Sequence, residues 1–236
     1  MTLGAGSVRA LTGPRHAGHT TSLDDLGALS LPVGDDGVVI GEDSEGRAQI
    51  AGFHRPVPYE VLLIGGLWTA QVLALRAAAT GARVAVETAR APLWTGLARA
   101  AGAGLECLTL HEVGRVPPMG ATVSGPVLVI RDCGMRPPRG RVVSSPWQSV
   151  LTLLPYMSPV APRLMRNSAL VGVQRVSPEE AGQIGRILGL TRGEVDVLPT
   201  LADGVTLWSA GGERQWVLTR PTDAETGLLG VARRMD

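Results

Sequence analysis

The residues most able to do chemistry follow short apolar runs of the chain. Gly65 and Gly66 come directly after one such run. Glu87 lies 22 residues beyond Gly65, and Asp132 closes a second run. A glycine turn after a strand, with an acid about 20 residues further on, is the spacing of a dinucleotide site, and an aspartate at a strand end can hold magnesium in an ATPase. These four residues are therefore the candidate cofactor-binding residues.

The glycines complete neither nucleotide motif. When G-x-G-x-x-G is read from Gly65, Leu67 stands at the second glycine position, where pyrophosphate must approach the backbone. A P-loop needs a lysine, but all 22 basic residues are arginines, and Trp68 stands where the loop should be open. The sequence therefore favours a structural glycine turn. It predicts no cofactor, and it predicts that the chain is not an enzyme.

Metal and nucleophile chemistry also lack a matching motif. The two cysteines, Cys107 and Cys133, are 26 residues apart with no CxxC pair, so they cannot complete a four-ligand zinc site alone. None of the four histidines stands in an H-x-x-x-H frame; they are His16, His19, His54 and His111. The sequence predicts no metal site and no catalytic residues.

A β-α-β pattern positions the glycines and the two acids. Residues 59–64 and 83–88 read as strands that flank a helix at 67–80, and apolar runs that continue without alternation are typical of parallel strands covered on both faces. Further strands are predicted at 105–110, 127–130 and 170–174, and helices at 92–102, 150–157, 159–166 and from Ser177 to 189. The fold class is α/β, with a mainly parallel sheet of Rossmann-like or P-loop-like type. N-terminal and C-terminal β-hairpins are predicted at 37–53 and 205–219.

The chain of 236 residues is long enough for one large core, and 44% of it is hydrophobic. We predict a flexible N-terminal arm over 1–30, a single α/β domain over 31–222 and a C-terminal tail over 223–236. Glycines interrupt the apolar run 61–75 and prolines interrupt the uncharged run 142–162, so neither reads as a membrane span. We expect a cytoplasmic location. A chain that also contacts the inner face of the membrane peripherally is the second option.

Charge is unevenly distributed although the net charge is only +1. The segment 133–178 has six arginines and no acid, whereas the segment between Arg15 and Arg47 has seven acids and no base. The arginines either cover their own surface and pair with the acidic segment, or form a face that docks an acidic protein or lipid headgroups. Arginine and tryptophan often dominate interfaces. The predicted partner-binding residues are Arg136, Arg139, Arg141, Trp147, Arg163 and Arg166.

Two other functions stay open at this point. The strand-end crevice could make the chain a nucleotide-sensing or small-molecule-sensing module. Residues 177–198 and the following hairpin could form a winged helix that binds DNA, but the second helix carries Glu194 and Asp196, and phosphate contacts need the opposite charge. No nucleic-acid partner is therefore expected.

The order of these elements resembles a known family. The segments 40–47 (IGEDSEGR), 82–93 (ARVAVETARAPL) and 127–132 (VLVIRD), together with the Gly65-Gly66 pair, are similar to FtsK/EccC-type ATPase modules of actinobacterial type VII (ESX) secretion. The arginine-rich middle, punctuated by prolines, also resembles the cytosolic domain of the EccE-type component. The resemblance covers roughly residues 37–175. It implies a scaffold or adaptor with a degenerate nucleotide-binding fold, and protein partners in a membrane-associated secretion complex.

Overall fold

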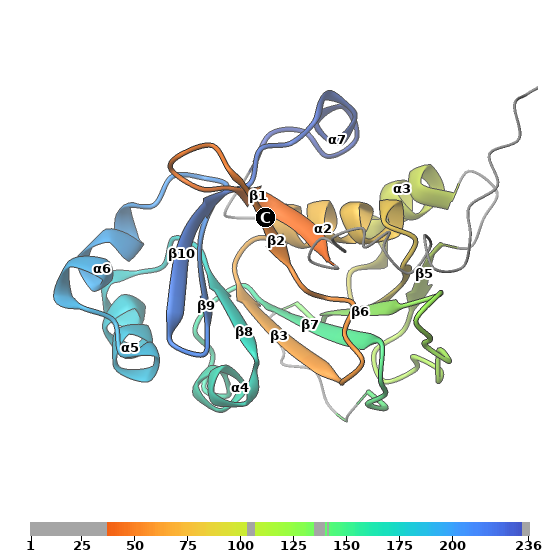
Figure 1. Cartoon of the computed structure of the whole chain (residues 1–236), viewed down its shortest axis with the longest axis horizontal. Helices are drawn as coiled ribbons and strands as arrows, with labels where there is room; N and C mark the ends of the chain where they lie inside the picture. The colour runs from red at the N-terminus through yellow and green to blue at the C-terminus, as the bar shows by residue number, and fades with distance from the viewer. Residues whose placement is uncertain (1–36, 103–106, 135–139, 141, 233–236) are drawn as a thin grey trace, which may run out of the picture. The chain divides into compact units, whose positions relative to one another are not determined.

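The computed structural model describes residues 37–102, 107–134, 140 and 142–232. Within them a ten-stranded sheet has the order β2-β1-β10-β9-β8-β3-β7-β6-β4-β5 (Figure 1). The strands are β1 (Val38–Glu42), β2 (Ala48–Ala51), β3 (Tyr59–Ile64), β4 (Arg83–Thr88), β5 (Leu108–His111), β6 (Val127–Asp132), β7 (Gln148–Leu154), β8 (Leu170–Val173), β9 (Val205–Ala210) and β10 (Glu213–Leu218).

The sheet has a parallel part and an antiparallel part. Strands β8, β3, β7, β6, β4 and β5 run parallel, and β3 lies between β7 and β8. Strands β9, β10, β1 and β2 are antiparallel to their neighbours and include the two predicted hairpins. The prediction of an α/β fold with a mainly parallel sheet is confirmed.

Helices cover both faces of the parallel part. They are α2 (Leu67–Ala79), α3 (Ala91–Gly102), α4 (Ala161–Asn167), α5 (Pro178–Leu188), α6 (Arg192–Val197), the 3₁₀ turn η1 (Leu198–Thr200) and α7 (Asp223–Leu229). Side chains alternate along β3, so Val61 and Leu63 join the core under α2 and α3, while Leu62 and Ile64 join the core under α4 and α5. Figure 1 shows these two groups of helices on opposite sides of the sheet. The central strand is therefore buried on both faces.

Two segments differ from the prediction. Residues 150–157 were expected to be helical, but Gln148–Leu154 is strand β7, and all seven of its residues are buried. A short run that is apolar throughout does not distinguish a buried strand from a buried helix. In the segment predicted as a tail, Asp223–Leu229 forms α7. The predicted arm, residues 1–30, lies outside the described residues.

Short local signals determine where three of the helices begin. Ser177 caps α5 by accepting a hydrogen bond from the backbone N–H of Glu180, whose carboxylate accepts from the Ser177 N–H. Thr191 with Glu194 and Thr222 with Glu225 repeat this capping box at α6 and α7. The expected N-cap at Ser177 is thus confirmed. Among the described residues, no helix combines the length and hydrophobicity that a membrane span requires.

Candidate functional site

The candidate site is the edge of the sheet where the parallel strands have their carboxyl ends. Open α/β sheets bind ligands in the crevice outside this edge. Gly65 and Gly66 leave β3 here and lead directly into α2, and Gln174 follows β8 on the neighbouring strand. The backbone N–H of Gly65 donates to the Leu154 carbonyl at 2.9 Å, and that of Gln174 donates to the Ile64 carbonyl at 2.9 Å. These bonds extend the sheet and hold the three residues close together.

The side chain of Gln174 fills the position at the start of α2 where a P-loop would hold phosphate. Its Oε1 accepts a hydrogen bond from the Gly66 N–H at 2.7 Å, and its Nε2 donates to Thr69 Oγ1 at 2.6 Å and to Thr206 Oγ1 at 3.2 Å. Gln174 is only 2% exposed. A helix N-terminus attracts anions because its first N–H groups lack partners within the helix. Here a neutral amide from the chain itself partners one of these groups.

Gly65 is required at its position by this arrangement. A Cβ atom on Gly65 would lie 2.5 Å from Gln174 Oε1, a separation that real Cβ atoms essentially never show, so the Gln174 amide would have to move. The glycine pair therefore allows close approach of the Gln174 amide, in place of the phosphate approach that the motif suggested.

Asp132, at the carboxyl end of β6, is enclosed by donors. Its Oδ1 accepts from Arg90 Nη2 at 2.8 Å, and its Oδ2 accepts from Trp94 Nε1 at 2.8 Å and from Thr88 Oγ1 at 3.3 Å. The carboxylate is 1% exposed. Both oxygens thus join the end of β4 and the first turn of α3 to β6. In this arrangement they stabilise the packing of α3 and are not directed at an open site.

Glu87 lies on the face of the sheet opposite to Asp132. In the register of β4 and β6, Thr88 pairs with Asp132. One residue earlier, Glu87 pairs with Arg131. Because successive side chains of a strand point to opposite faces, the two pairs project from opposite faces of the sheet. Glu87 accepts hydrogen bonds from Arg131 Nε and from the Gly114 N–H, the latter at 2.8 Å. The structure therefore brings Gly65 and Gly66 together but separates Glu87 from Asp132. A shared cofactor site for these four residues stays a prediction.

Cys133 is buried directly after Asp132. Burial, and then the nearby Glu87 carboxylate, raise the pKa of the Cys133 thiol to about 11, because both disfavour the thiolate. A thiol with this pKa is a weak nucleophile at neutral pH. No group of three potential metal ligands is found within the described ranges.

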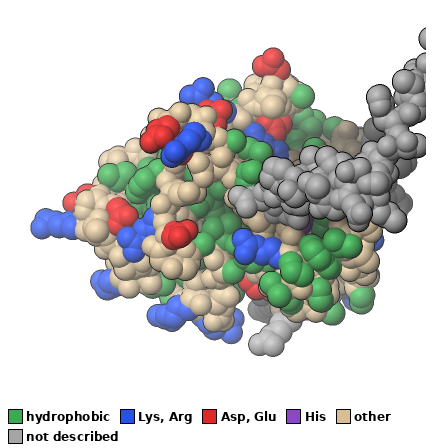
Figure 2. All heavy atoms as spheres, viewed as in Figure 1, with side chains coloured by type: hydrophobic (Ala, Val, Ile, Leu, Met, Phe, Trp, Pro, Cys, Tyr) green, Lys and Arg blue, Asp and Glu red, His purple; other side chains and the backbone are tan. Residues whose placement is uncertain are grey.

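The predicted partner-binding residues divide into three groups. Arg136, Arg139 and Arg141 lie outside the described residues. Arg163 and Arg166 are exposed on α4, and Figure 2 shows basic side chains at the surface over this helix. Trp147 is half-buried at the amino end of β7 and has a φ of 60°, a backbone conformation that is uncommon for a bulky residue. Its N–H donates to the Arg55 carbonyl at 2.8 Å.

Sequence reasoning missed the residues that complete these clusters. Gln174 carried one usable signal, since it is a polar residue directly after the apolar strand LVGV. Arg90 and Trp94 carried a weaker signal, because an arginine or a tryptophan near the start of a helix does not by itself indicate that it donates to a buried carboxylate. Only the strand order shows that Gln174 lies beside Gly65, because β3 and β8 are far apart in the sequence.

Comparisons with known proteins identify the fold. No protein-family model and no curated protein matches the sequence. The structure of VirB4 of Thermoanaerobacter pseudethanolicus is similar over 81% of this chain and 98% of that chain, with a TM-score of 0.55 and 10% sequence identity. The genome packaging NTPase B204 from Sulfolobus turreted icosahedral virus 2, in complex with ATP-gammaS, matches 70% of this chain and 98% of its own with a TM-score of 0.45 and 8% identity. Its sulfate complex gives a TM-score of 0.47 at 10% identity, over 71% of this chain and 98% of its own.

The chain therefore has an α/β fold with a mainly parallel sheet that is similar to the fold of VirB4. This agrees with the FtsK-type part of the resemblance seen in the sequence. The prediction that the chain is not an enzyme is wrong on this finding, because this fold belongs to a class of proteins that is usually enzymatic.

Proposed function

We propose that the chain is an adaptor-type component of a type VII (ESX) secretion assembly, with a degenerate phosphate position in an NTPase fold. The observation that carries the proposal is the hydrogen bond of 2.7 Å from the Gly66 N–H to Gln174 Oε1, in a fold similar to that of VirB4. A side chain of the protein takes the place that phosphate takes in a P-loop. Binding of a protein partner is then the role of the protein surface.

The contacts around Gln174 support a closed phosphate position. Its amide has partners on α2, on β9 and on the β3–α2 turn, so moving it outward would break three hydrogen bonds. Each such bond contributes about 1 kcal/mol net, and each buried group left unpaired costs about 1–3 kcal/mol. The position therefore opens only at a substantial energetic cost.

The partner-binding part of the proposal rests on the arginine-rich segment. The expected face comprises Arg136, Arg139, Arg141, Trp147, Arg163 and Arg166. The two described members on α4 are exposed, and the segment from 133 to 178 contains no acid that would neutralise them locally. We propose an acidic surface of a membrane-associated secretion ATPase as the partner. The proposed location of the chain is the cytoplasm, at the inner face of the membrane.

Co-purification tests the partner. The tagged chain is expressed with an FtsK/EccC-type ATPase of a type VII system, and a stable complex is expected. Reversing four charges, with Arg136, Arg139, Arg163 and Arg166 each replaced by Glu, is expected to reduce capture at least tenfold. Arg192→Glu is the matched control, because Arg192 is 95% exposed on α6, outside this face. Unchanged capture by the fourfold variant would contradict the arginine face, and no capture by the wild type would contradict the assembly.

Thermal unfolding with nucleotide tests the phosphate position. A ligand at about 100 times its Kd adds roughly 2.7 kcal/mol to stability. We expect ATP with magnesium to leave the melting temperature of the wild type unchanged. A clear rise with ATP in the wild type would show that Gln174 does not close the position and would refute this part of the proposal.

A further inference from the structure

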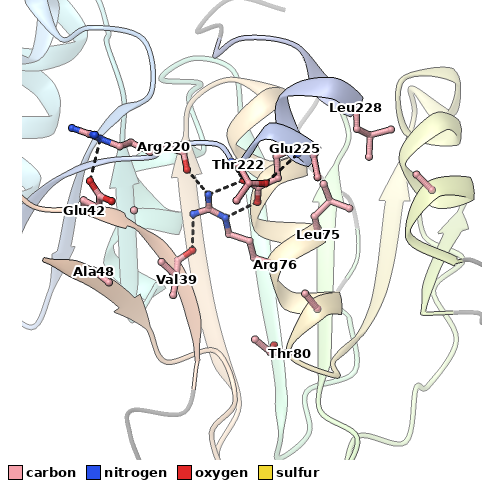
Figure 3. A pocket seen from close by; sticks show the side chains of 14 residues that line it. Val39, Glu42, Ala48, Leu75, Arg76, Thr80, Arg220, Thr222, Glu225 and Leu228 are labelled. Carbon is pink, nitrogen blue, oxygen red and sulfur yellow. Dashed lines mark hydrogen bonds and ion pairs between the residues drawn. The ribbon is translucent and has the colours of Figure 1, made fainter. Parts of the chain in front are cut away.

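A second region, far along α2 from the glycine pair, has the properties of a ligand site. A cavity of about 830 Å³ opens beside the carboxyl-terminal half of α2 (Figure 3). Its volume lies within the range of small-molecule sites, about 300–1,000 Å³. We call it the α2 groove. Its lining residues include Val39, Leu75, Ala79, Ala100, Arg220 and Leu228.

The walls of the α2 groove are mostly apolar and come from several helices and strands. Leu75 and Ala79 belong to α2, Val39 to β1 and Leu228 to α7. Val39 and Leu228 keep 42% and 38% of their surface exposed. Covering such apolar surface with an apolar molecule is favourable, at roughly 25 cal/mol per Å².

A fixed arginine holds the walls in place. Arg76 donates to Glu225 Oε1 at 2.7 Å, to the Val39 carbonyl at 3.0 Å and to the Arg220 carbonyl at 2.7 Å, as Figure 3 shows. These bonds connect α2 to α7, to β1 and to the segment before α7. All three nitrogen atoms of the Arg76 guanidinium are thus hydrogen-bonded, and they hold the walls of the groove together.

Arg220 can supply charge at one end of the groove. Its Nε lies 3.1 Å from Glu42 Oε2, and the Arg220 side chain is 67% exposed. Exposed ion pairs contribute about 0–1 kcal/mol, so the pair separates at little cost. Figure 3 shows Arg220 and Glu42 at one end of the groove and Leu75 and Leu228 towards the other. The groove therefore has a polar end and an apolar end.

We propose that the α2 groove binds a free single-chain amphiphile with an anionic head, such as a fatty-acid-like carboxylate. The chain lies along Leu75, Ala79 and Leu228, and the head pairs with the Arg220 guanidinium. This inference is independent of the proposed function, because it uses neither the arginine-rich segment nor the glycine pair.

Titration calorimetry tests the inference with sodium decanoate as the probe and decanol as its uncharged counterpart. Decanoate is expected to bind the wild type at least about tenfold more tightly than decanol. Arg220→Ala is expected to weaken decanoate binding about tenfold and to leave decanol binding unchanged. Arg175→Ala is the matched control. Arg175 does not line the groove, and its Nη2 forms a similar partly exposed ion pair with Asp203 Oδ1 at 2.8 Å. This substitution should leave both affinities unchanged.

Filling the cavity tests the position of the chain. Ala79→Trp on α2 and Ala100→Trp on α3 both place a large ring in the groove from exposed positions, so folding of at least one variant, checked by circular dichroism, is expected. Each should abolish decanoate binding. Several results would overturn the proposal: no decanoate binding by the wild type, equal affinity for decanol, or full binding by the folded tryptophan variants. Sedimentation with phosphatidylglycerol vesicles without binding of free decanoate would also overturn it, in favour of a membrane surface.

Discussion

The two ends of helix α2 adjoin regions with opposite properties. At the amino end, the polar groups are buried and paired with one another, and Gln174 occupies the space where an anion would bind. Along the carboxyl-terminal half, the wall of the α2 groove is mostly apolar and open, and the Arg76–Glu225 pair is part of its lining. In this chain, a buried glutamine side chain partners the start of α2, whereas the groove along the other end of α2 is open. A fold therefore indicates where sites can form, and the side chains decide which of them does.

Removing a buried carboxylate at the strand ends should have the largest effect on stability. Asp132→Ala leaves the Arg90 guanidinium and the Trp94 Nε1–H without their acceptor in a buried setting. Breaking a buried pair in this way costs about 3–5 kcal/mol, and the partial exposure of Arg90 favours about 3 kcal/mol. Urea unfolding at pH 7 measures the change. Asp203→Ala is the control, since its pair with Arg175 has the same distance of 2.8 Å but is partly exposed, and it should cost under about 1 kcal/mol.

Substitutions of Gln174 should show whether the amino end of α2 prefers an anion. Gln174→Ala leaves the Gly66 N–H and two hydroxyl groups unpaired, at a cost of about 2 kcal/mol. Gln174→Glu should cost less, because a carboxylate accepts from the Gly66 N–H near the positive end of the helix dipole and the threonine hydroxyls can rotate to donate. Urea unfolding of the two variants gives the comparison. A Glu variant less stable than the Ala variant would show that this end of α2 does not favour negative charge.

The ion pair at the other end of α2 should give a smaller effect that depends on pH. Burial raises the pKa of Glu225, but the hydrogen bonds from Arg76 and the Thr222 N–H outweigh it, so the pKa lies below the ordinary value of 4.5. The pair therefore stabilises the fold above about pH 4.5, and this stabilisation is lost as the pH falls through the lowered pKa. Glu225→Gln should lower the free energy of unfolding by about 1 kcal/mol at pH 7. The difference from the wild type should shrink at acidic pH, and a difference that stays constant down to pH 3 would contradict the assignment.

The smallest effect is expected at the contact that holds the end of α7. Trp68 Nε1 donates to the Gly230 carbonyl at 3.1 Å. Trp68→Phe keeps most of the apolar contact and removes this bond, so a loss of about 0.5–1 kcal/mol is expected from urea unfolding. Faster hydrogen exchange limited to α7 would locate the effect there, whereas faster exchange throughout β3 and β4 would contradict it.

The sequence predicted all but one of the parallel strands and most helices because their signals are local. The apolar runs that became β3 and β6 and the capping box at Ser177 each need only a few neighbouring residues. Strand β7 was missed because its pattern is apolar throughout, which helices and buried strands share.

The candidate site was harder to predict because it depends on strand order and on the face of each side chain. Glu87 and Asp132 are both strand-end acids, but they project from opposite faces of the sheet. Gln174 reaches Gly66 only because β8 pairs with β3, although 108 residues separate the two in sequence. The absence of a lysine was readable from the chain, while the residue that takes the place of phosphate was not.

The pairing of β1 with β10 has a consequence for synthesis on the ribosome. Glu42 of β1 meets Leu218 of β10, near opposite ends of the described chain. At about 5–20 residues per second, β10 follows β1 by roughly ten to thirty-five seconds. During that interval the β1–β2 hairpin has no β10 beside it. By contrast, β4 is followed much sooner by β5 and β6, and β3 is followed by β7 after about half that length of chain. The nascent hairpin, with its unpaired edge, is therefore the part of the sheet most exposed to chaperones and to pairing with the wrong strand.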